Sequence, residues 1–131
     1  MSRKFSIFVC LILLALVGCH AKVTGTLQVD GITFAVEQCR SGQAFGFSGI
    51  ELTDANGRRL RLLASADGTC TAAIFKGDST TGDRLGSCGV LTMEAQSSRI
   101  NSIVNVKGTA KLACEAVGHK VTGKIEFENC H

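Results

Sequence analysis

Apolar and polar residues alternate along most of the chain after residue 22, the pattern of strands with one buried face. The stretch TLQVDGITFAV predicts a tight hairpin that turns at Asp30-Gly31. Its register sets apolar residues opposite one another, Leu27 and Val29 against Phe34 and Ile32.

Later stretches continue this antiparallel pattern. In IELTDANGRRLRLL, a turn over residues 54–57 pairs Ile50 with Leu62 and Leu52 with Leu60. SADGT then turns the chain into TAAIF, and we expect a loop over residues 76–89. A long C-terminal hairpin is expected to turn near Gly118-His119, with Leu112 opposite Ile125 and Cys114 opposite Gly123.

Helical periodicity is weak after residue 22, and 131 residues are enough for one domain. We therefore expect an all-β domain, an antiparallel sandwich or small barrel of about eight strands, preceded by an N-terminal signal helix. Two segments share one form, VTGTLQV at 23–29 and VTGKIEF at 121–127. A recurring strand with a glycine bulge or a close backbone contact explains them, and an ancient duplication is the alternative.

The N-terminus is basic at Arg3 and Lys4 and then has no charge from Phe5 to Gly18. An apolar run of about 14 residues is typical of a secretory signal and is short for a membrane span of about 20 residues. A true membrane anchor and an ordinary cleaved signal peptide are the alternatives.

The run ends in Leu16-Val17-Gly18-Cys19, which resembles the lipobox of bacterial lipoproteins. The resemblance implies cleavage between Gly18 and Cys19 and acyl chains, such as palmitate, on Cys19. Two or three chains give stable anchoring where one gives only marginal binding. His20 follows the cysteine where an Asp would favour retention in the inner membrane, so the likeness implies the outer membrane of a Gram-negative envelope.

The expected organisation is a signal peptide at 1–18, a lipidated cysteine and short tether at 19–22, and a single β domain at 23–131. Three extended tether residues, His20 to Lys22, reach about 10 Å, so the domain is expected to lie close to the membrane.

Five cysteines follow Cys19, and an exported chain meets oxidising conditions, so two disulfides and one free thiol are expected. Cys114 shares an alternating face with core residues, which favours it as the free thiol. Cys39 and Cys130 lie at the ends of their strands, on the parity opposite to that of the apolar residues, which favours a bridge between them that closes the domain. We expect Cys70 to be bridged to Cys88. A zinc site is the rival use, but the spacing of the cysteines does not favour it.

No catalytic motif surrounds the histidines at 20, 119 and 131, so surface roles are expected and no enzyme activity, cofactor or metal site is predicted. Asp54 with Asn56, or Asp78 with Asp83, could touch calcium, but turn chemistry explains them better. Phe45 and Phe47 lie in SGQAFGFSG and are a possible lip around a ligand; a hydrophobic plug is the alternative.

Arg3 and Lys4 supply two of the three net positive charges, so little net charge remains after cleavage and no nucleic-acid partner is expected. The segment KLACEAVGHKVTGKIEFENC resembles small uncharacterised β-rich lipoproteins, and the domain is faintly similar to the mycobacterial nineteen-kilodalton lipoprotein antigen group. These likenesses imply an envelope module anchored to the membrane, with a structural or interaction role and an envelope protein as a possible partner. A module binding a small apolar ligand and a periplasmic enzyme inhibitor are the alternatives.

Overall fold

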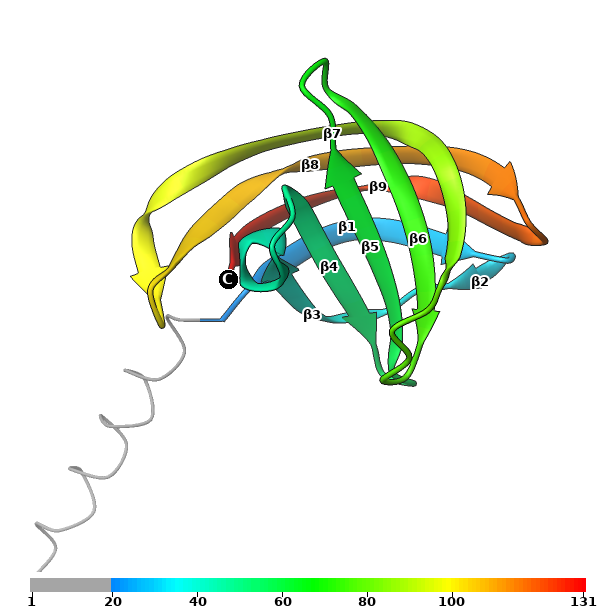
Figure 1. Ribbon diagram of the computed structural model, residues 1–131, viewed down its shortest axis with the longest axis horizontal. Coiled ribbons are helices and arrows are strands. Elements are labelled where there is room, and N and C mark those ends of the chain that lie inside the picture. The colour runs from blue at the N-terminus through cyan, green and yellow to red at the C-terminus, as the bar shows by residue number, and fades with distance from the viewer. Residues whose placement is uncertain (1–19) are drawn as a thin grey trace, which may run out of the picture.

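The computed structural model describes residues 20–131, which form one antiparallel sheet of nine strands (Figure 1). The strands are β1 (Lys22–Val29), β2 (Ile32–Thr33), β3 (Val36–Ser41), β4 (Gly49–Asp54), β5 (Arg58–Ala64), β6 (Thr69–Lys76), β7 (Asp83–Ile100), β8 (Ile103–Ala116) and β9 (His119–Cys130). One short 3-10 helix, η2 (Gly42–Phe45), follows β3. The all-β prediction is confirmed.

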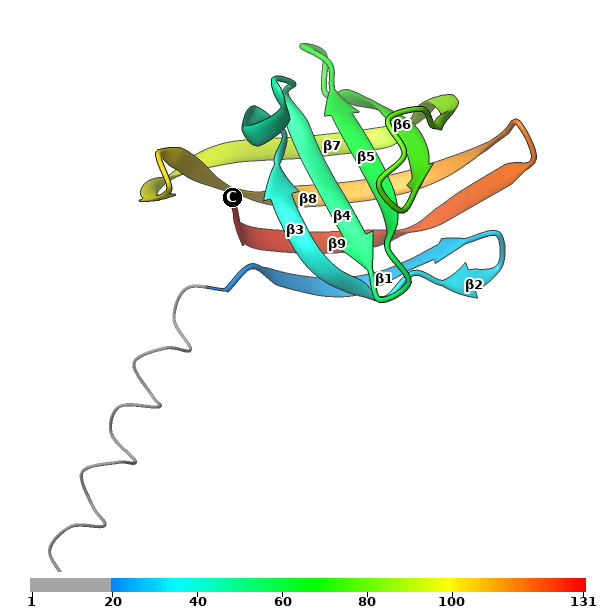
Figure 2. The ribbon, with the colours of Figure 1, turned by 60° about the horizontal axis from the view of Figure 1, so that its bottom comes forward.

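The sheet has the strand order β2-β1-β9-β8-β7-β6-β5-β4-β3 and curls into a half-barrel (Figures 1 and 2). The long strand β7 joins its two halves, because its first part pairs with β6 and its second part with β8. The edge strand β3 contacts β1, β8 and β9 across the curl. The fold is therefore the barrel-like form of the prediction, with nine strands instead of about eight.

The inner face of the curled sheet holds the hydrophobic core, to which every strand except β2 contributes. Alternate residues of each strand point inward, so the alternation seen in the sequence becomes one buried surface. Its fully buried large side chains are Leu27, Ile50, Leu52, Leu60, Leu62 and Ile125.

Most of the predicted hairpin registers are confirmed. Ile50 lies opposite Leu62 and Leu52 opposite Leu60, and Val29 pairs with Ile32. The two V-T-G segments are β1 and β9, which pair with each other. A Cβ on Gly25 would lie 2.3 Å from the Lys124 carbonyl oxygen, so the predicted close contact at this glycine is present.

Two local predictions were wrong. The C-terminal hairpin turns at Val117-Gly118, so Leu112 lies opposite Gly123 and Cys114 opposite Val121. The shift is by two residues, which leaves the same side chains facing the core. The expected loop at 76–89 ends early because β7 begins at Asp83.

The two disulfides are Cys39–Cys130 and Cys88–Cys114. The first confirms the predicted bridge. The predicted Cys70–Cys88 bridge and the free Cys114 were wrong, because Cys88 and Cys114 lie on neighbouring strands with their Cα atoms 4.6 Å apart. Among the five cysteines of residues 20–131, Cys70 is the free thiol, and burial raises its pKa to about 11, so it is a poor nucleophile.

The predicted signal helix, the cleavage site at Gly18 and the acceptor Cys19 lie outside the described residues. Within residues 20–131, no helix has the length and apolar character needed to cross a membrane.

Candidate functional site

Phe45 and Phe47 lie on the outer face of the sheet, where η2 leads into β4. The Ser41 hydroxyl accepts a hydrogen bond from the Gln43 amide, and the Phe47 amide donates to the Gly42 carbonyl at 3.0 Å. These bonds fold the segment into a compact turn in which the two rings stack with centroids 6.2 Å apart. The glycine-rich segment is therefore an ordered turn that presents two aromatic rings.

Arg61 of β5 packs against both of these rings and against Phe75. Its guanidinium carbon lies 4.7 Å from the Phe47 centroid and 4.9 Å from the Phe75 centroid. It also donates two hydrogen bonds to Glu51, at 3.0 and 2.8 Å, and Glu51 is only 3% exposed. The guanidinium is thus held by a carboxylate in its plane and by rings on its faces.

Arg59 completes this outer layer, which we call the arginine–phenylalanine cluster: Arg40, Arg59, Arg61, Glu51, Phe45, Phe47 and Phe75. Arg59 lies 3.5 Å from Glu51 and donates to the carbonyls of Gly77 and Ser79. The cluster fastens the turn after β6 to the outer face of β5. The sequence analysis singled out Phe45 and Phe47 but missed Phe75 and the arginines, because cross-strand neighbours depend on register.

A groove of about 570 Å³ crosses the cluster between β3 and the turn after β6. Phe45, which is 41% exposed, lines it, and the Arg40 guanidinium carbon lies 5.0 Å from the centroid of its ring. Phe47 packs under Arg61 and does not line the groove. The lining contains three arginines and two carboxylates, Glu51 and Asp78, so its net charge is positive. Such a lining suits a planar anionic group better than a purely apolar ligand.

His119 lies between two carboxylates at one end of the sheet. Its Nδ1 is 2.9 Å from Asp30 Oδ2 and its Nε2 is 2.8 Å from Asp83 Oδ2. Both ring nitrogens can donate only in the protonated imidazole. The hydrogen bonds to Asp30 and to Asp83 raise the pKa of His119, and the one to Asp30 has the larger effect. The hydrogen bond between His119 and Asp30 also lowers the pKa of Asp30.

We call this region the histidine end, defined by Asp30, Asp83 and His119. The β1–β2 turn, the β8–β9 turn and the start of β7 meet there, and Asp30 also accepts from the Lys120 amide at 2.9 Å. Sequence reasoning treated His119 as a surface residue in a turn. The missed partners are 89 and 36 positions away in the chain, so no local signal reveals them.

The opposite end, which we call the N-terminal end, is defined by His20, Ala21, Asn101 and His131, which line one groove with residues 37–40 of β3. The start of the described chain and the tip of the β7–β8 hairpin both line this groove, and Figure 1 shows them at the same end of the sheet. The Cys39–Cys130 bridge lies at this end.

Amide groups connect β7 and β9 near the N-terminal end. The Gln96 side chain donates to Asn129 Oδ1 at 3.1 Å and accepts from the Asn129 amide at 2.8 Å. These contacts are neutral, in contrast to the ion pairs of the histidine end.

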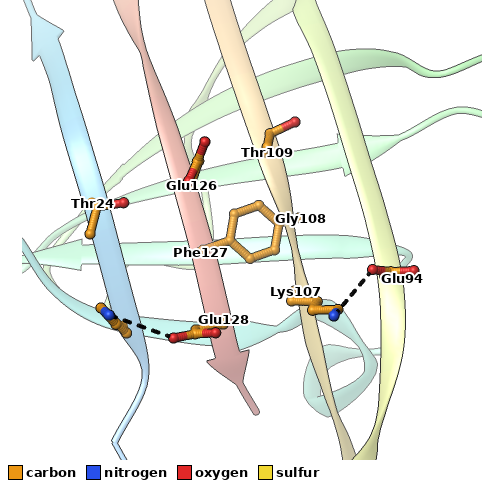
Figure 3. Close-up of a pocket in the computed structure, with 9 residues that line it drawn as sticks. Thr24, Glu94, Lys107, Gly108, Thr109, Glu126, Phe127 and Glu128 are labelled. Atoms are coloured by element: carbon orange, nitrogen blue, oxygen red, sulfur yellow. Dashed lines mark ion pairs between the residues drawn. The ribbon is translucent and has the colours of Figure 1, made fainter.

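A polar groove also runs over the outer face of β1, β9, β8 and β7 (Figure 3). Lys22 lies 3.9 Å from Glu128 and Lys107 lies 3.5 Å from Glu94, and these side chains are about half exposed or more. Such exposed pairs contribute little to stability, so this surface is a solvated face.

The calcium candidates have structural partners. Asp54 Oδ1 accepts from the amides of Asn56 and Arg58, and its Oδ2 lies 2.8 Å from Arg58 Nε, so Asp54 closes its turn. Asp83 contacts His119. Across residues 20–131, no group of three or more His, Cys, Asp or Glu side chains is arranged to hold a metal ion.

The chain matches no protein-family model, no curated protein and no solved structure at a significant level.

Proposed function

We propose that the protein is a lipid-anchored module of the bacterial cell envelope with a non-enzymatic structural or interaction role. The sequence support is the lipobox-like segment that ends at Cys19. The structural observation that carries the proposal is the start of β1 at Lys22, three residues after that cysteine. Three residues span about 10 Å, so acyl chains on Cys19 hold the sheet against the bilayer.

The anchor is tested by the change Cys19→Ala in cells fed a labelled fatty acid. The variant is expected to lose acyl labelling and to retain its signal peptide. Cys10→Ala is the matched control, because Cys10 lies in the segment that is removed and its loss leaves labelling intact. Labelling of the Cys19→Ala protein at the wild-type level contradicts the proposal.

The interaction role is tested by crosslinking in intact cells at native abundance, followed by mass spectrometry. An envelope protein captured by the wild type and lost in Cys19→Ala supports a role that depends on the anchor. Recovery of the uncrosslinked protein alone contradicts an interaction role.

Ligand binding is a second candidate, favoured by the exposed ring of Phe45 beneath Arg40. The cationic groove suits a ligand that joins a planar group to a carboxylate or phosphate. Benzoate and phenyl phosphate are suitable probes in an NMR titration of the wild type and Arg40→Gln. Shifts at Phe45 that weaken in the variant support this candidate, and unchanged spectra contradict it.

A further inference from the structure

The tip of the β7–β8 hairpin carries little charge. Between Glu94 and Lys107 the sequence carries one charged residue, Arg99. The turn residues Asn101 and Ser102 have φ values of +51° and +67°, the backbone of a tight hairpin turn. On either side of the turn, Ile100 and Ile103 pair across the strands and are each partly exposed.

This tip projects beyond the body of the sheet. The last residue of β9, Cys130, pairs with Val106, so β8 residues before Val106 extend past the end of β9. Three residues of strand, from Val106 back to Ile103, correspond to about 10 Å. The projection is as long as the tether that links Cys19 to Lys22.

The tip and the tether lie at the same end of the sheet. Asn101 of the turn lines the groove that His20 and Ala21 also line. Figure 1 shows the hairpin tip, in yellow, and the start of β1, in blue, at the same end of the sheet, while the β8–β9 turn lies at the far end. An acyl group on Cys19, one residue before His20, therefore fixes the bilayer surface beside the tip.

We propose that the β7–β8 tip, residues 99–103, docks on the lipid surface as a second membrane contact, with Ile100 and Ile103 entering the headgroup layer. The proposal rests on the lipid anchor proposed above. A headgroup layer is about 5 to 7 Å thick, so a 10 Å projection beside the anchor reaches it. Partly exposed isoleucines gain by leaving water, and Arg99 suits anionic headgroups.

The other end of the sheet is a poor membrane surface. It also exposes apolar residues, Ile32 at 65% and Val117 at 66%. However, Asp30, Asp83 and His119 lie among them, and charges are costly to move into a bilayer. The charge distribution and the tether thus select the same end.

A tryptophan reporter tests the contact, because the natural chain has no Trp and no Tyr. The acylated full chain carrying Ile103→Trp is reconstituted in vesicles of phosphatidylethanolamine and phosphatidylglycerol with brominated acyl chains. Ile32→Trp is the matched control, because it makes the same change at an exposed isoleucine of the histidine end. Ile100→Trp provides a second tip reporter if Ile103→Trp fails to fold.

The proposal expects emission from the tip reporter to shift to shorter wavelength and to be quenched by the brominated lipid, with neither change for Ile32→Trp. A shift without lipid quenching means that another protein copy covers the tip, and it overturns the proposal. An acylated, vesicle-bound chain with an unquenched tip overturns the tip contact alone. If the protein purified from its native membranes carries no acyl group and does not bind the vesicles, both the contact and the anchor are overturned.

Discussion

The two ends of the curled sheet are built from different chemistry. The histidine end joins three chain segments through His119, Asp30 and Asp83, all of which can carry charge. The N-terminal end is closed by the Cys39–Cys130 bridge and by neutral amide contacts between Gln96 and Asn129. Both ends expose some apolar surface, so the type of contact that closes each end is what distinguishes them.

The contacts that close the two ends respond differently to pH. Contacts between ionisable groups respond to pH, whereas a disulfide and amide hydrogen bonds do not over the same range. The N-terminal end therefore keeps a fixed shape beside the proposed anchor. The histidine end is the region whose stability follows the pH of the medium.

The largest effect on stability is expected when the disulfide of the N-terminal end is removed. Replacing both Cys39 and Cys130 by Ser removes a bridge between residues that are 91 positions apart in the chain. The change is expected to lower the unfolding free energy by about 4 to 5 kcal/mol. Replacing Cys88 and Cys114 by Ser removes a bridge between residues that are 26 positions apart and is expected to lower the unfolding free energy by about 3 to 4 kcal/mol. Denaturant unfolding measures both, and an equal or reversed order contradicts the role of Cys39–Cys130 as the main closure.

At the histidine end, stability is expected to fall as the pH rises. The raised pKa means that folding favours the protonated His119, whose contribution is complete below about pH 6.5 and is lost as the pH passes the folded-state value. Asp30 and Asp83 are 39% and 56% exposed, so screening limits the effect to about 1 kcal/mol.

His119→Gln is expected to remove this pH dependence. His131→Gln at the N-terminal end is the control and is expected to keep it. The test is to measure the unfolding free energy of each protein across the neutral pH range. A wild type that becomes more stable as the pH rises through this range contradicts the assignment to His119.

A smaller effect is expected at the hairpin tip. Ile103→Thr is expected to cost about 0.5 to 1 kcal/mol because Ile103 is only partly buried. Ile50→Thr, at a fully buried position, is expected to cost about 2 kcal/mol or more. A large loss of stability in Ile103→Thr would mean that the tip serves the core instead of an outer surface.

The smallest effect is expected on the polar outer face. Glu128→Gln removes the exposed pair with Lys22 at 3.9 Å and is expected to change the unfolding free energy by less than about 0.5 kcal/mol. Thermal and denaturant unfolding both measure it. A larger loss would show that this face contributes to the closure of the N-terminal end.

Local patterns predict the strands and several registers of this fold. The turn residues Asp54 and Gly57 fix the pairing of Ile50 with Leu62, because a tight turn leaves little freedom in register. The β8–β9 turn was misplaced because Val117 adopts a φ of +46°, which is unusual for a β-branched residue.

The candidate sites depend on contacts that no local pattern encodes. Parity along the strands identified Cys39 and Cys130, but choosing between Cys70 and Cys114 as the partner of Cys88 requires knowing the neighbouring strand. The same holds for the packing of Arg61 on Phe75 and for His119 between its two carboxylates. Residues that meet across a curled sheet are specified by register and curvature together.

Mass spectrometry of the N-terminal peptide of the protein purified from its native membranes tests the anchor most directly. The peptide is expected to begin at Cys19 and to carry a diacylglyceryl group on the Cys19 sulfur. A peptide that begins at Met1, or a cleaved chain with an unmodified Cys19, would contradict it.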